Sequence, residues 1–239
     1  MSYKGHFFGA WSGLIFIPLF GIGWMVFAGF IPPISPAATA AEVANLYQGH
    51  NIQIIIGMVF MLISIAFLVP YFGMMSVLMA RIEGRWPVLA IFAGMSGVIN
   101  VVYFVIPVLA WLTVAFRPEQ SPEIIRVFND FGWFTMLWPF SSTVMQNVLF
   151  GIVILSDKRE KPLLPRWLGF FSIMEGTIAI SGGLIGFFTA GPFAWNGIIS
   201  FWLVAIAYLV WMFFTSIEFH KSVKTIIQEE SQLATVANI

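Results

Sequence analysis

The sequence predicts an all-α fold, an integral membrane bundle of six transmembrane helices with both termini in the cytoplasm. The observations behind this prediction are the composition, six long apolar segments and the placement of the basic residues. Of the 239 residues, 59% are hydrophobic and only 9% are charged, and the mean hydropathy is +0.92. Soluble domains carry about 25% charged residues. A chain this apolar has too little polar surface to face water, so its solvent must be lipid.

Six apolar segments are each long enough to span a bilayer, which takes about 20 residues at 1.5 Å per residue. In chain order they are Phe7–Phe30, Ile52–Met79, Pro87–Phe116, Phe131–Leu155, Leu168–Thr189 and Gly197–Ile217. The first exceeds the apolar core of about 7–15 residues in a signal peptide, so we expect an uncleaved helix. Prolines that can kink the first four spans are Pro18, Pro70, Pro107 and Pro139.

The basic residues orient the bundle. On one predicted side lie nine of the eleven Lys and Arg residues, namely Lys4, Arg81, Arg85, Lys158, Arg159, Lys161, Arg166, Lys221 and Lys224. Only Arg117 and Arg126 fall on the other side. Because basic residues accumulate on the cytoplasmic side, both termini are expected there. We expect one transmembrane domain over residues 1–224 and a polar cytoplasmic tail over residues 225–239.

Two outer segments are predicted to be helical. One is alanine-rich, begins at Ser35-Pro36 and ends near Gly49. The other opens at Ser121-Pro122 and has the pattern of an interfacial helix that leads into the fourth span.

Tryptophans are placed mainly at the outer side. For Trp24, Trp111, Trp133 and Trp138, membrane-interface anchoring is favoured over a pocket wall. Interface insertion is likewise favoured over a lid for Trp195, in the loop before the sixth span.

Glu175 is the only charged residue between Leu168 and Thr189. A carboxylate at this depth costs from about 2.5 kcal/mol upward, so it is a candidate functional group by default. It follows Arg166 by nine residues, which places it about 13 Å deep, near the midplane. Its helical face is mostly small and directs it into the bundle, with Phe171, Ser172, Ala179, Gly182 and Gly186 on that face.

Other spans supply polar or aromatic side chains that can meet Glu175. The candidate ligand-binding set is Glu175, Asn100, Tyr103, Gln146, Asn147, Trp111 and Trp138, with Tyr208 nearby. Two interpretations remain open for Glu175. In one, it hydrogen-bonds to an amide and fixes the helix arrangement. In the other, it faces a cavity and meets a ligand, proton or ion. For Asn100, Gln146 and Asn147, each taken by itself, the structural role is favoured.

Several functional classes lack their required residues. The chain has no Cys and only three His, and no Lys lies within a span. This excludes thiolate metal sites, di-iron centres and a retinal Schiff base. The phosphate loop, the nucleophile elbow and the zinc-protease motif are also missing. With a net charge of zero, nucleic acid is not an expected partner. We expect neither a metal site nor a cofactor.

The layout resembles small bacterial six-span inner-membrane proteins. The features that carry the resemblance are the length, the alanine-rich outer segment and the run Lys161-Pro162-Leu163-Leu164-Pro165-Arg166-Trp167-Leu168-Gly169. The resemblance implies a location in the bacterial inner membrane and assigns no catalytic residue.

Three functions are compatible with the sequence. The leading prediction is a protein that binds or helps to handle a lipophilic small molecule in an aromatic-lined cavity anchored by Glu175. One alternative is a membrane-embedded isomerase or cyclase with Glu175 as general acid and Tyr103 or Asn100 orienting the substrate. Another is a proton- or ion-coupled transporter with Glu175 as the proton carrier. Membrane lipid is an expected partner, and glycine pairs such as Gly9/Gly13 would permit a homo-oligomer.

Overall fold

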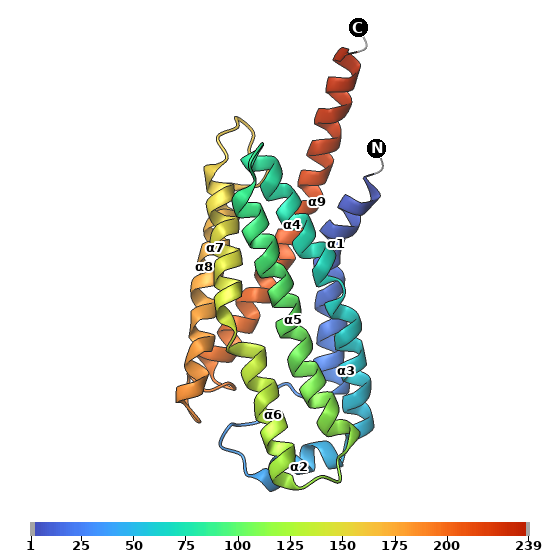
Figure 1. The fold of residues 1–239 in the computed structure, drawn as a ribbon, viewed down its shortest axis with the longest axis vertical. Coiled ribbons are helices and arrows are strands. Elements are labelled where there is room, and N and C mark those ends of the chain that lie inside the picture. The colour runs from blue at the N-terminus through green and yellow to red at the C-terminus, as the bar shows by residue number, and fades with distance from the viewer. Residues whose placement is uncertain (1–2, 238–239) are drawn as a thin grey trace.

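The computed structural model describes residues 3–237, which form helices and loops without a β-strand. Six helical segments are long and apolar enough to cross a membrane, as the sequence predicts. They pack side by side into an elongated bundle (Figure 1).

Most spans consist of two consecutive helical pieces. The elements in chain order are α1 (Lys4–Gly21) with η1 (Ile22–Phe27), the short α2 (Ala40–Gln48), α3 (Asn51–Ile65) with α4 (Leu68–Glu83), α5 (Val88–Phe116), α6 (Pro122–Leu137) with α7 (Phe140–Ser156), α8 (Arg166–Ala179) with η2 (Ile180–Phe187), and η3 (Ile198–Leu203) with α9 (Val204–Ala237). The segments η1 and η3 are π-helical and η2 is a 3₁₀-helix.

The prolines explain two of the breaks. A proline lacks the N–H for the helical hydrogen bond and its ring clashes with the carbonyl four residues earlier. The second span is interrupted at Ala66–Phe67, just before Pro70, and the fourth is interrupted at Trp138–Pro139. By contrast, Pro18 and Pro107 lie inside continuous α-helices.

Helix α5 packs against α3, α4, α6 and α7, while α7 packs along α8. Small residues allow the closest approaches between helices. A Cβ atom on Gly151 of α7 would lie 2.6 Å from the carbonyl oxygen of Gly169 on α8. Such contacts let backbones pack at short range where lipid provides no hydrophobic driving force.

The start of α1 and the end of α9 lie at the same end of the bundle (Figure 1). We call this the inner end; the α4–α5 and α7–α8 connections also lie there, and α2 lies at the opposite, outer end. The polar residues after Lys224 continue α9 as a helix to Ala237. There Arg81 pairs with Glu229 and Glu230 at 3.5 and 3.0 Å, and the Tyr3 hydroxyl donates to Glu230.

At the outer end, α2 begins at Ala40, later than the expected start at Pro36. Thr39 and Glu42 form a reciprocal capping box that fixes this start. From α2, the Tyr47 hydroxyl donates to Asn129 Oδ1 at 3.0 Å and ties α2 to α6. The expected helix after Ser121 is α6, with Ser121 as its N-cap.

Three tryptophans are buried, contrary to the expected interface anchoring, and a fourth, Trp24, lines the cavity described below. Trp111 and Trp133 are buried inside the bundle, where neither indole can reach the lipid headgroups, so the prediction is wrong for both. Trp195 is also buried, and its Nε1 donates to the Ile34 carbonyl at 2.8 Å. Trp195 therefore links the α8–α9 loop to the loop before α2 instead of inserting into the interface.

Candidate functional site

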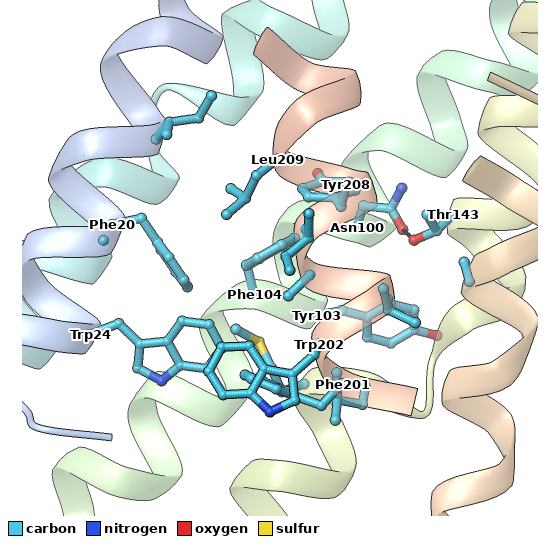
Figure 2. Close-up of a pocket in the computed structure, with 18 of the residues that line it drawn as sticks. Phe20, Trp24, Asn100, Tyr103, Phe104, Thr143, Phe201, Trp202, Tyr208 and Leu209 are labelled. Carbon is cyan, nitrogen blue, oxygen red and sulfur yellow. Dashed lines mark hydrogen bonds between the residues drawn. The ribbon is translucent and has the colours of Figure 1, made fainter. Parts of the chain in front are cut away.

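A cavity of about 320 Å³ lies inside the bundle beside Glu175. It is enclosed by α1 and η1, α5, the α6–α7 junction, α8, and η3 with α9. Its wall is mostly apolar and rich in aromatic side chains. These include Phe16, Phe20, Trp24, Phe104, Phe201 and Trp202, most of which Figure 2 shows.

The cavity exists because α1 and α9 pack tightly at one end and separate toward the other (Figure 1). At the tight end, a Cβ on Gly13 of α1 would lie 2.3 Å from the Ser216 hydroxyl oxygen of α9. Toward the outer end the two spans become the π-helical segments η1 and η3. Irregular π-helical segments occur often at functional sites. Here both contribute to the wall, through Trp24 and Trp202.

The opening of the cavity faces the lipid-exposed surface of the bundle. Three lining residues are substantially exposed, with Met25 at 55%, Ile206 at 57% and Leu209 at 37%. Met25 belongs to η1, whereas Ile206 and Leu209 belong to α9. All three side chains are apolar, and they flank the gap between the first and sixth spans.

Glu175 of α8 is among the residues that line this cavity and is fully buried. One carboxyl oxygen, Oε2, accepts a hydrogen bond from the Asn147 side-chain amide of α7. The other, Oε1, has no hydrogen-bond partner among residues 3–237. The carboxyl group is therefore only half satisfied by the protein, and buried polar atoms without a partner are costly.

Two further cavity-lining groups also lack partners within the described part of the chain. They are the Tyr208 hydroxyl of α9 and the Trp24 indole Nε1 of η1. Figure 2 shows these side chains on different sides of the cavity, with Trp24 on the α1 side. Together with Glu175 Oε1 they are three buried polar atoms without a partner, all in residues that line the apolar cavity.

The buried amides of Asn100 and Gln146 are satisfied by protein groups, whereas Asn147 Oδ1 has no partner among residues 3–237. Asn100 Nδ2 donates to Gln146 Oε1 at 2.6 Å, and Gln146 Nε2 donates to the Ala93 carbonyl at 3.3 Å. Asn100 Oδ1 accepts from Ser142 and Thr143. These bonds join α5 to α7 and support the structural role favoured for the amides. Asn100 still contributes to the cavity wall, whereas Gln146 and Asn147 lie behind it.

The sequence-derived site residues are thus partly brought together. Glu175, Asn100 and Tyr103 line the cavity, and Asn147 supports Glu175 from behind. The two tryptophans lie elsewhere. Trp111 is buried near the outer end, with its Nε1 3.4 Å from the Asn129 carbonyl, and Trp138 is half exposed and packs over Gly186.

Much of the aromatic wall was not predicted, although the sequence contains a signal for part of it. Phe16, Phe20 and Trp24 recur every four residues, so they share one face of the first span. Their rings pack in series, with centroid distances of 4.9 and 5.4 Å. That stripe does not itself distinguish a cavity wall from ordinary helix packing.

Comparisons with protein-family models, curated proteins and solved structures found no match for this chain. The functional argument therefore rests on the geometry of the cavity.

Proposed function

We propose that this protein binds a lipophilic small molecule, taken laterally from the bilayer, in the cavity anchored by Glu175. We further propose that the inner end faces the cytoplasm of a bacterial cell, with the bundle in the inner membrane. The observation that carries the binding proposal is the unpartnered Oε1 of Glu175 at the wall of an apolar cavity.

Size and chemistry both support a small-molecule ligand. A volume of about 320 Å³ is at the lower end of the range for small-molecule sites, about 300–1,000 Å³. Such sites combine apolar walls with a few polar groups that orient the ligand. A ligand hydroxyl donating to Oε1 would remove the cost of the unpartnered oxygen, so binding can be favourable beyond apolar contact alone.

The enzyme and transporter alternatives receive less support. Glu175 is the only acidic or basic residue among the lining residues that the structure describes, so acid–base chemistry would need Tyr103 or Tyr208 as its second group. A carrier must also open toward both aqueous sides, whereas the lining residues with the greatest exposure are apolar and flank a gap in the lipid-facing surface.

A ligand test can use the purified protein in lipid nanodiscs. We expect native mass spectrometry to detect a co-purifying apolar compound, and lipophilic compounds to raise the unfolding temperature. Glu175→Leu should weaken this stabilisation because it removes the polar anchor. Glu218→Leu is the matched control, since Glu218 is a mostly buried carboxylate of α9 outside the cavity.

Glu175→Gln separates binding from proton chemistry. Glutamine keeps the size of the side chain and its hydrogen-bonding capacity but cannot exchange a proton. A binding protein should retain its ligand affinity within a few-fold. Loss of substrate turnover or of pH-driven uptake in this variant, with affinity intact, would instead favour the enzyme or the transporter. The absence of both a co-purifying compound and any ligand-induced stabilisation would refute the proposal.

A further inference from the structure

The three unpartnered groups of the cavity differ in what they require from a ligand. Trp24 Nε1–H is a donor only, so it requires an acceptor atom. A carboxyl group accepts a hydrogen bond in either protonation state, and the Tyr208 hydroxyl can donate or accept. A ligand that satisfies all of them therefore carries an acceptor near Trp24 and a hydroxyl or similar group near Glu175 and Tyr208.

A continuous aromatic surface joins these two polar places. The Tyr208 ring lies 6.0 Å from Phe104, Phe104 lies 5.6 Å from Phe20, and Phe20 lies 5.4 Å from Trp24. Figure 2 shows Phe104 and Phe20 between Tyr208 and Trp24. Aromatic walls bind planar rings well, because offset-stacked and edge-to-face contacts stabilise beyond area burial alone.

The size of the cavity and its opening restrict the rest of the ligand. A volume of about 320 Å³ is at the lower end of the range for small-molecule sites and suits a ring head group. Because the opening between Met25 and Ile206 faces the lipid-exposed surface, a hydrocarbon tail attached to the ring can extend into the bilayer.

We propose that the ligand class is a planar ring head group with oxygen atoms on opposite edges and a hydrocarbon tail, as in an alkylated quinol. The head group lies against Phe20 and Phe104, one oxygen contacts Glu175 and Tyr208, and the other accepts from Trp24. This inference rests on the proposed binding function and specifies the ligand of the same cavity.

Three probes with the same tail test the class: decylhydroquinone, meta-decylphenol and decylbenzene. Their rings carry two, one and no hydroxyl groups, respectively. The shared decyl tail keeps all three in the lipid of the nanodisc. Apparent affinity is measured from the rise in unfolding temperature at equal mole fraction in the lipid, with the quinol kept reduced. We expect decylhydroquinone to bind at least about tenfold more tightly than decylbenzene, with the phenol in between.

Two pairs of variants locate the contacts. Trp24→Phe removes an unpartnered indole N–H from a residue that lines the cavity. Trp133→Phe removes an unpartnered buried indole N–H from a residue that packs on Trp24 but does not line the cavity. Tyr208→Phe and Tyr71→Phe form the same kind of pair, since both rings pack on Trp211 but only Tyr208 lines the cavity.

The preference for the quinol over decylbenzene should fall about three- to tenfold in Trp24→Phe and Tyr208→Phe, and remain unchanged in Trp133→Phe and Tyr71→Phe. Equal binding of all three probes would overturn the ligand class while leaving a lipophilic binding cavity supported. A preference that falls equally in cavity and control variants would also overturn it. If none of the probes or other lipophilic compounds binds saturably, the proposed function itself fails.

Discussion

Individual polar residues of this bundle divide into those that the protein satisfies and those that it does not. Many Ser and Thr hydroxyls bond to a backbone carbonyl of the preceding turn, as Ser172 does to Leu168 at 2.8 Å. The amides between α5 and α7 bond to one another. In contrast, Glu175 Oε1 and the Tyr208 hydroxyl are buried at the cavity without a partner within residues 3–237. The candidate site is identified by the coincidence of unsatisfied atoms and the cavity, since other buried atoms without a partner, such as the Tyr71 hydroxyl, belong to residues that do not line it.

The Asn100–Gln146 pair provides a test of the structural role at the residue scale. Asn100→Leu should destabilise the bundle by about 1–3 kcal/mol, because it leaves buried groups of Gln146 and Ser142 without their partner. A double-mutant cycle with Gln146→Leu should give a coupling energy of about 0.6–1.7 kcal/mol, the range for interhelical hydrogen bonds in membranes. Equilibrium unfolding in mixed detergent measures both quantities. A coupling energy of zero would show that the bond does not join α5 to α7 energetically.

At the scale of elements, the site depends on where helical geometry changes. Both spans beside the opening, the first and the sixth, contain a π-helical segment at its level, η1 and η3. Segment η1 is held against α3 by a glycine contact, since a Cβ on Gly57 would lie 2.4 Å from the Gly23 carbonyl oxygen. This close packing keeps Trp24 in its place at the cavity wall.

Gly57→Ala should therefore destabilise the protein by about 1–3 kcal/mol, the usual cost of overpacking. Gly73→Ala is the matched control in the same span, because a Cβ there meets nothing within 4 Å. The control should be neutral or stabilising by up to about 1 kcal/mol, since alanine favours helix more than glycine does. Thermal unfolding in nanodiscs compares the two variants. Equal effects would contradict the close contact between η1 and α3.

For the whole molecule, the charge distribution distinguishes the two ends of the six-span bundle. The inner end carries most of the Lys and Arg residues, including Arg159, which binds Asp157 in the α7–α8 connection at 2.6 Å. Partial burial raises the pKa of Asp157. Hydrogen bonds from Arg159 and from the Leu163 N–H lower this pKa by more, so the pKa lies below its usual value. Asp157 is therefore ionised at neutral pH, as its pairing with Arg159 requires.

The absence of cysteine allows a direct test of orientation. Glu119→Cys and Glu160→Cys place single thiols at exposed positions of the outer and inner ends, respectively. In intact bacterial spheroplasts, a membrane-impermeant maleimide should label Glu119→Cys, whereas Glu160→Cys should react only after permeabilisation. The reverse pattern would contradict a cytoplasmic inner end. Equal labelling of both in intact cells would contradict their location on opposite sides.

Sequence alone was enough to predict the class of protein, the number of spans and the presence of a buried carboxyl. These properties depend on local quantities: apolar length, composition and helical spacing around Glu175. Each is a property of one segment in contact with lipid or water, so no knowledge of neighbouring segments is needed.

Only the tertiary structure decided which polar groups meet one another and which face empty space. Asn147 and Gln146 are adjacent in sequence, yet one bonds to Glu175 on α8 and the other to Asn100 on α5. Trp24 lines the cavity and Trp111 does not, although both were expected at the interface. Such differences arise because a cavity is formed where α1 and α9 separate, and the angle between two helices depends on side chains from several spans at once.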